Sequence, residues 1–165
     1  MQQANSEVQT DDSRLRFFQS FIGQSMSQSI SPVGRWLNGT LLAIEPGAMK
    51  MSFVIGPDMI NPMMVLHGGI AATILDDVIG TMVYALGREH AYTSVNLNCD
   101  FLHAAKLGDT LIAHAFVVRA GRNIIHVEAE LVDEQGKIIA KCSSNMIQTS
   151  LKIPALPVNG ADKKS

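Results

Sequence analysis

The chain has 165 residues and a mass of 17.8 kDa, which fits one compact domain, because single hydrophobic cores usually stop growing beyond about 250 residues. Hydrophobic residues make up 47% of the chain and charged residues 17%, with a mean hydropathy of +0.16, and this apolar excess favours contacts between subunits. The formal net charge of −2 does not provide the basic surface needed for nucleic-acid binding or polybasic membrane attachment. We therefore expect a small-molecule partner, with no nucleic acid and no membrane.

The cysteines and the N-terminal residues indicate the cellular compartment of the protein. Cys99 and Cys142 are 43 positions apart and belong to no CxxC pair, so the sequence indicates neither a disulfide framework nor a zinc site. The first twelve residues are polar and acidic, and no run of about 18 apolar residues is apparent. We expect no signal peptide, no membrane span and a cytoplasmic protein.

Residues 1–34 are expected to form an N-terminal extension. Residues 1–10 have the composition of a disordered segment, and Asp11-Asp12-Ser13 then offers a helix cap. Apolar residues follow at helical spacing, which predicts a short helix; they are Leu15, Phe17, Phe18, Phe21 and Ile22. Residues 24–34 are rich in Ser, Gln and Gly and contain Pro32, as is typical of a linker or a lid-like loop.

Two strands and a long helix are predicted next. Strands over Trp36 to Ile44 and Ala48 to Ile55 flank Glu45-Pro46-Gly47, a turn sequence that indicates a hairpin. From Leu66 to Leu86 the chain is apolar nearly all round, and Gly87 is the residue type expected just past a helix end. Such a helix must be buried.

Four further runs have strand character, and short glycine-containing connections join them. They are Tyr92 to Leu102, Thr110 to Arg119, Asn123 to Asp133 and Lys137 to Thr149. This order predicts an α+β fold in which an antiparallel sheet curves around one long central helix, with an extra N-terminal helix. We assign residues 35–150 to this domain and residues 151–165 to a loose C-terminal tail.

The chemistry concentrates where the long helix begins, in the segment from Asn61 to Gly69. Gly68 and Gly69 allow the backbone to come close to a ligand, and the free N–H groups and dipole of a helix N-terminus favour developing negative charge. This pattern indicates an oxyanion hole. The alternative is that the two glycines only permit tight packing of the helix start.

Two adjacent carboxylates, Asp76 and Asp77, are the only charged side chains between His67 and Gly87. They are about 100° apart around a helix axis, so one can be buried while the other is in solvent. Burying a carboxylate is costly without a partner or a function. We interpret Asp76 as catalytic and Asp77 as solvated or salt-bridged. Ser94 falls on the polar side of an alternating strand, where its hydroxyl could orient a carboxylate or a water.

These residues carry a family resemblance. His67-Gly68-Gly69, Asp76 nine residues after His67, and Ser94 eighteen after Asp76 resemble the phenylacetate-pathway (PaaI-like) and thioesterase-superfamily-member branch of hotdog-fold acyl-CoA thioesterases. The likeness includes Asn61 and extends over about residues 36–149. It implies the hotdog fold and hydrolysis of an acyl- or aryl-acyl-CoA thioester to free acid and coenzyme A. The coenzyme A belongs to the substrate, so no cofactor is implied.

The resemblance also implies residue roles. Asp76 would be the general base or nucleophile, the Gly68 N–H would polarise the thioester carbonyl, and Ser94 would position the lytic water. Asn61 would help to hold the substrate or the water. Further substrate-binding candidates are His67, Gly69, Met64 and Arg122. One position departs from the pattern, because relatives commonly have Gly three residues after the Asn, where this chain has Met64.

A geometric argument predicts shared sites. Asp76 is eight residues beyond Gly68, so the two lie about 12 Å apart along a helix, which an Asp side chain cannot bridge. If both act on one carbonyl, each comes from a different subunit of a two-fold dimer. The resemblance implies the same homodimer, and commonly a homotetramer built as a dimer of dimers.

Other readings remain open. The five histidines form no HExxH motif or close pair, so we expect no metal site. Arg122, near a turn, is a candidate for contact with coenzyme A phosphates, although such arginines are usually only solvated. A hotdog-fold hydratase or dehydratase acting on acyl-CoA is one alternative function. A non-catalytic acyl-CoA-binding module is the other.

Overall fold

The computed structural model describes residues 11–154 and residue 156. Within them the elements are α1 (Ser13–Gln19), α2 (Pro32–Leu37), β1 (Thr40–Glu45), β2 (Ala48–Val54), α3 (Gly68–Ala85), β3 (His90–Phe101), β4 (Thr110–Ala120), β5 (Ile124–Asp133) and β6 (Ile138–Lys152). The expectation that residues 1–10 are disordered lies outside the described residues, as does most of the expected loose tail. β6 extends to Lys152, two residues beyond the predicted end of the domain.

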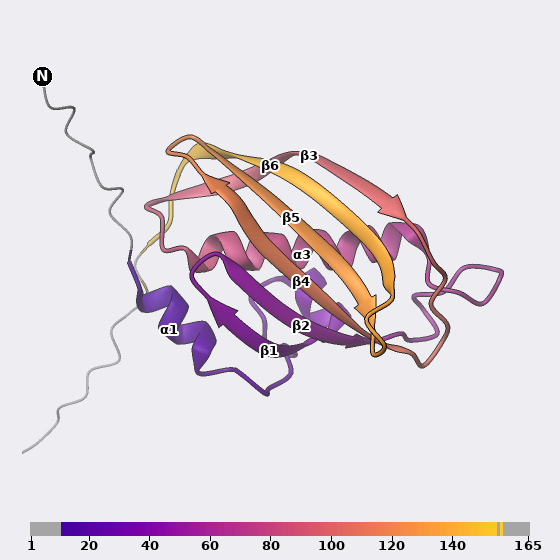
Figure 1. Ribbon diagram of the computed structural model, residues 1–165. Coiled ribbons are helices and arrows are strands. Elements are labelled where there is room, and N and C mark those ends of the chain that lie inside the picture. Colours follow the sequence, from indigo (N-terminus) through magenta and orange to yellow (C-terminus); the bar gives the residue numbers. More distant parts are fainter. Residues whose placement is uncertain (1–10, 155, 157–165) are drawn as a thin grey trace, which may run out of the picture.

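The strands form one antiparallel six-stranded sheet in the order β1-β2-β4-β5-β6-β3. The sheet curves over α3, and α1 lies beside α3 and β1 at the N-terminal end of the fold (Figure 1). β1 and β3 are the edge strands. The predicted α+β arrangement, with one sheet around one long helix and an extra N-terminal helix, is therefore confirmed.

Helix α3 is the centre of the core. It packs against β2 to β6, and its buried side chains include Ile74, Leu75 and Ile79, each fully enclosed. Burying one such side chain stabilises the fold by about 1.5–3 kcal/mol. By length and composition alone α3 could also cross a membrane, but 44% of its residues are buried inside this domain. The helix therefore has the character of a core helix.

One strand prediction was wrong at its start. Trp36 and Leu37 belong to helix α2, and β1 begins only at Thr40. The side chain of Ser31 accepts a hydrogen bond from the Gly34 N–H at 3.0 Å, and Pro32 occupies the first helical position. This N-cap and proline pair starts a helix, and it outweighs the strand preference of the aromatic and aliphatic residues that follow. The predicted loop over residues 24–34 therefore ends in a helix.

The predicted N-terminal helix is confirmed as α1, but its cap differs from the expectation. Asp12 makes no side-chain cap bond, whereas the Asp11 carboxylate accepts hydrogen bonds from the Ser13 N–H at 2.9 Å and the Ser13 hydroxyl at 2.6 Å. These bonds hold the pKa of Asp11 below its usual value. The Asp11 N–H donates to the Gly87 carbonyl at 2.9 Å, so the start of α1 is tied to the end of α3.

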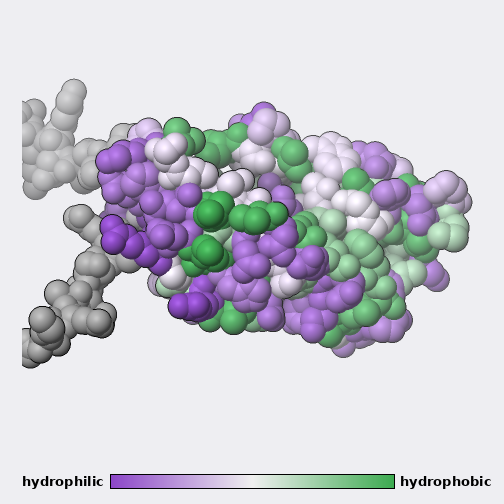
Figure 2. Space-filling model, turned by 90° about the horizontal axis from the view of Figure 1, so that it is seen from above, coloured by the Kyte–Doolittle hydropathy of each residue, from purple (hydrophilic) through white to green (hydrophobic). Residues whose placement is uncertain are grey.

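The face of the molecule seen in Figure 2 carries both hydrophobic and hydrophilic residues. Hydrophobic residues occur there in small groups separated by hydrophilic ones. Large apolar side chains that remain exposed in the single chain include Val95 and Phe101, both on the edge strand β3. An edge strand presents unpaired N–H and C=O groups that can pair with another chain.

Replacing Gly87 with alanine should destabilise the protein strongly. Gly87 has φ +70°, and a β-carbon there would overlap the carbonyl oxygen of Asp11. Gly136 has a similar φ of +81° with nothing within 4 Å, which makes it the matched control. We expect Gly136→Ala to lower the free energy of unfolding by about 1 kcal/mol and Gly87→Ala by more than about 2 kcal/mol. Urea unfolding at one protein concentration measures both, and equal losses would refute the role of the Asp11 contact.

Candidate active site

The loop that leads into α3 is shaped by Asn61. Its side-chain oxygen accepts hydrogen bonds from the Met63 N–H at 2.9 Å and the Val65 N–H at 3.3 Å, while its backbone N–H donates to the Val65 carbonyl at 2.8 Å. The loop extends past the end of the sheet (Figure 1). Asn61 therefore positions the segment that carries His67 and Gly68, and its predicted contact with substrate or water stays a prediction.

Met64 adopts φ +63°, in the left-handed region that favours glycine. This is the position where the sequence departs from the glycine common in the family it resembles. Met64 and its neighbour Met63 are exposed, at 57% and 76% of their surface. The methionine therefore keeps the backbone turn that a glycine would make there, and it adds a flexible apolar side chain at the mouth of the loop.

The first turn of α3 leaves one amide without a partner. The Nδ1 atom of His67, the N-cap residue, accepts from the Gly69 N–H at 2.9 Å. The N–H groups of Ile70 and Ala71 both donate to the His67 carbonyl. No described residue accepts a hydrogen bond from the Gly68 N–H. Gly68 thus offers a free donor at the positive end of the helix dipole, as an oxyanion site requires, whereas the Gly69 amide is occupied by the cap.

Asp76 and Ser94 are brought together as their spacing suggested. The Ser94 hydroxyl lies 3.3 Å from the Asp76 Oδ1 atom, across from the middle of α3 to the edge strand β3. Both side chains are exposed in the single chain. Of the two adjacent carboxylates, Asp76 is therefore the one in solvent within a single chain.

A β-bulge decides which side of β3 carries Ser94. The pairing of β3 with β6 shifts between Ser94 and Asn96, with Val95 as the extra residue. Ser94 is opposite buried Met146, and Cys99 is opposite buried Cys142, so both face the helix. Strict alternation had put Ser94 on the same face as Asn96 and Asn98, which was wrong, because one inserted residue exchanges the two faces of a strand.

Asp77 is the more enclosed of the two carboxylates. It is half-buried, and its Oδ1 atom accepts a hydrogen bond from the Ser31 hydroxyl at 3.1 Å. Burial raises the pKa of the Asp77 carboxyl, although the Ser31 bond acts in the opposite direction. Asp77 forms no salt bridge with any described residue. The prediction of a solvated or salt-bridged Asp77 was wrong, because the N-terminal extension covers this face of α3.

A cavity of about 430 Å³ lies between that extension and α3. Its lining is mostly apolar and comes from α1, the loop before α2, one face of α3 and Leu156; it includes Phe17, Phe21, Met26, Ile30 and Tyr84. Asp76 and Asp77 form part of its wall. The sequence reading did not identify this cavity. The only signals for it were the aromatic spacing in α1 and the lid-like composition of residues 24–34.

The remaining predicted site residues do not all lie close together. Gly68 and Asp76 are eight residues apart on one continuous helix, which separates them by about 12 Å. Arg122 is exposed at the turn between β4 and β5, and its carbonyl accepts the Tyr92 hydroxyl at 2.6 Å. The described residues contain no cluster of three or more His, Cys, Asp or Glu side chains suited to a metal ion.

Comparisons with known proteins agree with this architecture. Residues 63–140 match the family model of the thioesterase superfamily. Human acyl-coenzyme A thioesterase 13 is 27% identical over 103 residues, which span 62% of this chain and 74% of the relative. A thioesterase-like, phenylacetic acid degradation-related protein of Ralstonia eutropha is 29% identical, with a TM-score of 0.66 over 74% of this chain and 96% of its own.

A further comparison concerns the fold alone. The protein smu.793 of Streptococcus mutans, solved bound to acetyl CoA, is 22% identical and superposes with a TM-score of 0.64 over 68% of this chain and 89% of its own. The matched family segment contains the helix start, both carboxylates and Ser94. With its antiparallel sheet around one long helix, the chain has the hotdog fold, and residues 63–140 are similar to the thioesterase superfamily.

Proposed function

We propose that the protein hydrolyses acyl-CoA thioesters to a free acid and coenzyme A. One observation carries the proposal: the Asp76 carboxylate, 3.3 Å from the Ser94 hydroxyl, lies on the wall of an apolar cavity. A carboxylate is the group that can activate water or attack a carbonyl, and an apolar cavity suits an acyl group. The name of human acyl-coenzyme A thioesterase 13 supports the same reaction.

The proposed chemistry uses groups with separate tasks. Asp76 either removes a proton from a water that Ser94 orients, or attacks the thioester carbonyl itself. The carbonyl oxygen gains negative charge as the new C–O bond forms, and the free N–H of Gly68 stabilises it. The C–S bond then breaks and the coenzyme A thiolate takes up a proton. If water attacks, the free acid forms directly; if Asp76 attacks, the acyl group stays on Asp76 as a mixed anhydride, which a water then hydrolyses to release the acid and restore the carboxylate.

The same proposal requires two chains for each site. The 12 Å along α3 between Gly68 and Asp76 is too long for both to reach one carbonyl. We propose a two-fold homodimer in which the Gly68 amide of one chain faces Asp76 of the other. The free edge of β3, with Val95 65% exposed and Phe101 56% exposed, supports a partner on this side. A dimer of such dimers would give the tetramer that the family resemblance implies.

The cavity beside Asp76 is the proposed binding site for the acyl group. At about 430 Å³ it falls in the range of about 300–1,000 Å³ usual for small-molecule sites. Its aromatic side chains favour an extended alkyl or an aryl-acyl group over a short acyl group such as acetyl. Because Phe17 of α1 and Phe21, just after α1, both line this cavity, the N-terminal extension would set the acyl preference.

Asp76→Asn should keep the fold and remove most of the turnover. An amide replaces the volume of the carboxylate but can act neither as a base nor as a nucleophile, so we expect kcat to fall on the order of 10²–10⁴-fold. Ser94→Ala should lower kcat by less, since an orienting hydroxyl contributes position only. Release of free thiol from a series of acyl-CoA and aryl-acyl-CoA substrates measures both effects.

Asp100→Asn is the matched control for these variants. Asp100 is exposed on the same strand as Ser94, and its loss removes an equal charge outside the proposed site. Circular dichroism and gel filtration should be the same for all three variants. Wild-type kcat in a folded Asp76→Asn protein would eliminate the proposed mechanism. A larger loss of kcat in Ser94→Ala than in Asp76→Asn would assign the reacting group to the serine.

A further inference from the structure

The charged side chains that line the larger cavity, about 430 Å³ in volume, all carry the same sign. They are Asp76 and Asp77, and none of the other described residues in the lining is Lys, Arg or His. The other polar side chains in the wall are neutral, since they belong to Ser, Thr, Gln and Tyr residues. The cavity is therefore an apolar space with a negatively charged wall.

Asp77 is the carboxylate of this wall that the fold encloses. A β-carbon on Gly34 would lie 3.2 Å from the Asp77 Oδ2 atom, so the backbone of α2 closes against the carboxylate. The Oδ1 atom accepts the Ser31 hydroxyl at 3.1 Å, and no Lys, Arg or His nitrogen of the described residues lies within 4.0 Å of the carboxylate. A hydroxyl donor brings no charge, so the negative charge of Asp77 is not neutralised.

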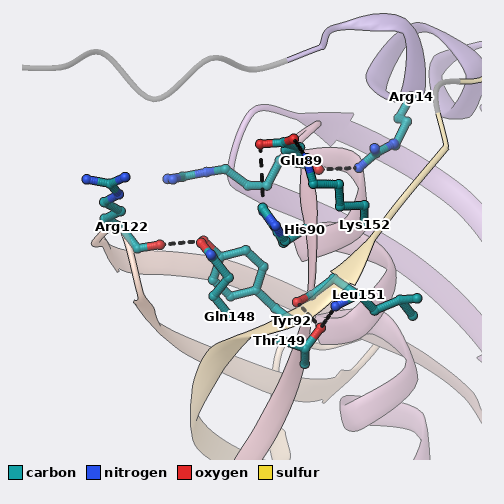
Figure 3. A network of polar contacts seen from close by, with 11 residues as sticks. Arg14, Glu89, His90, Tyr92, Arg122, Gln148, Thr149, Leu151 and Lys152 are labelled. Carbon is teal, nitrogen blue, oxygen red and sulfur yellow. Dashed lines mark hydrogen bonds and ion pairs between the residues drawn. The ribbon is translucent and has the colours of Figure 1, made fainter.

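Two arginines lie near this wall without lining it. Arg35 is exposed, and its Nη1 atom donates to the Ser29 carbonyl at 2.7 Å. The guanidinium carbon of Arg14 lies 4.8 Å from the centroid of the Tyr84 ring, while its Nη1 atom donates to the Arg88 carbonyl at 2.9 Å (Figure 3). Arg14 lines a second, smaller cavity of about 170 Å³ at the C-terminal end of α3. Both guanidinium groups are thus bound to backbone carbonyls, and neither lines the larger cavity.

A charged group inside the larger cavity is subject to two separate effects. The first is desolvation, which disfavours a buried cation and a buried anion alike. The second is the field of Asp76 and Asp77, which repels an anion and attracts a cation; over about 8 Å such a field is still significant at the effective dielectric constant of a protein site. Aromatic rings in the wall, such as those of Phe17 and Phe21, also favour a cation over an anion. The wall therefore distinguishes the two signs of charge, whereas desolvation does not.

We propose that Asp77 makes the larger cavity selective by charge, so that it accepts neutral and cationic acyl groups and excludes acyl groups that end in a carboxylate. The inference rests on the proposed function, because it takes this cavity as the acyl site and Asp76 as the reacting group. With the thioester carbonyl at Asp76, the rest of the acyl group enters a space whose wall includes Asp77, the next residue on α3. Thioesters of dicarboxylic acids would therefore be poor substrates.

Three acyl-CoA substrates of similar chain length test the effect of charge. They are hexanoyl-CoA, which is neutral at its far end, adipoyl-CoA, which ends in a carboxylate, and ε-aminohexanoyl-CoA, which ends in an ammonium group. Release of free thiol gives kcat/KM for each at about pH 8, where ordinary carboxyl groups are ionised and ordinary alkylammonium groups are protonated. We expect the wild type to hydrolyse ε-aminohexanoyl-CoA with a kcat/KM at least about tenfold higher than that for adipoyl-CoA.

Asp77→Asn removes the charge of this side chain and keeps its size. We expect it to lower the ratio of kcat/KM for ε-aminohexanoyl-CoA to kcat/KM for adipoyl-CoA by about fivefold or more, because the repelled anion gains and the attracted cation loses. Asp12→Asn is the matched control, since Asp12 is exposed at the start of α1, makes no side-chain cap bond and does not line the cavity. It should keep the wild-type ratio, and circular dichroism should show that both variants are folded.

A binding measurement separates this inference from the proposed hydrolysis. Octylammonium and octanoate, titrated by calorimetry into the same three proteins, compare a cation and an anion of equal chain length without any reaction. If no acyl-CoA is hydrolysed, the proposed function fails, and the ratio of the two Kd values decides the charge selectivity instead. The inference is overturned if the wild type treats the cationic and anionic ligands equally. It is also overturned if folded Asp77→Asn protein keeps the wild-type ratio.

Discussion

The rigid length of α3 is the constraint on which the rest of the structure depends. The helix is held by the surrounding sheet, and its side chains Ile74, Leu75 and Ile79 are fully buried, so it can neither bend nor slide to bring its own ends together. Its free Gly68 amide and its Asp76 carboxylate are therefore fixed about 12 Å apart. A chemistry that needs both groups at one carbonyl needs a second copy of the helix, which makes assembly part of the proposed active site.

The N-terminal extension contributes to two cavities beside α3. On one side of α3 it supplies Phe17 and Phe21 to the apolar cavity and covers Asp77, whose pKa is raised by that burial. On the other side it supplies Arg14, which caps the end of the helix and adjoins the smaller cavity with Arg88. Residues 1–34 lie outside the segment that matches the family model. The proposed reacting groups Gly68, Asp76 and Ser94 lie inside the matched segment, whereas the extension supplies part of the proposed acyl site.

Much of the architecture could be predicted from local sequence patterns, because periodicity and turn residues are local signals. The long helix and its end at Gly87 follow from such patterns, whereas the approach of Ser94 to Asp76 follows from the family resemblance. The rest depends on contacts that no local pattern encodes. A single inserted residue, Val95, turned Ser94 toward the helix, and the distant Ser31 enclosed Asp77. The burial of Arg88, whose Nη1 atom has no hydrogen-bond partner among the described residues, could be seen only in the folded chain.

Mixed dimers test the shared site most directly. A Gly68→Val chain and an Asp76→Asn chain, each inactive alone, are co-expressed with different tags and purified through both, so that every dimer holds one of each. One site of this heterodimer carries both lesions, while the other combines intact Gly68 from one chain with intact Asp76 from the other. The account predicts about half the turnover of a wild-type dimer, because two-fold symmetry makes the sites equivalent. Verified heterodimers without turnover would contradict a site shared between two chains.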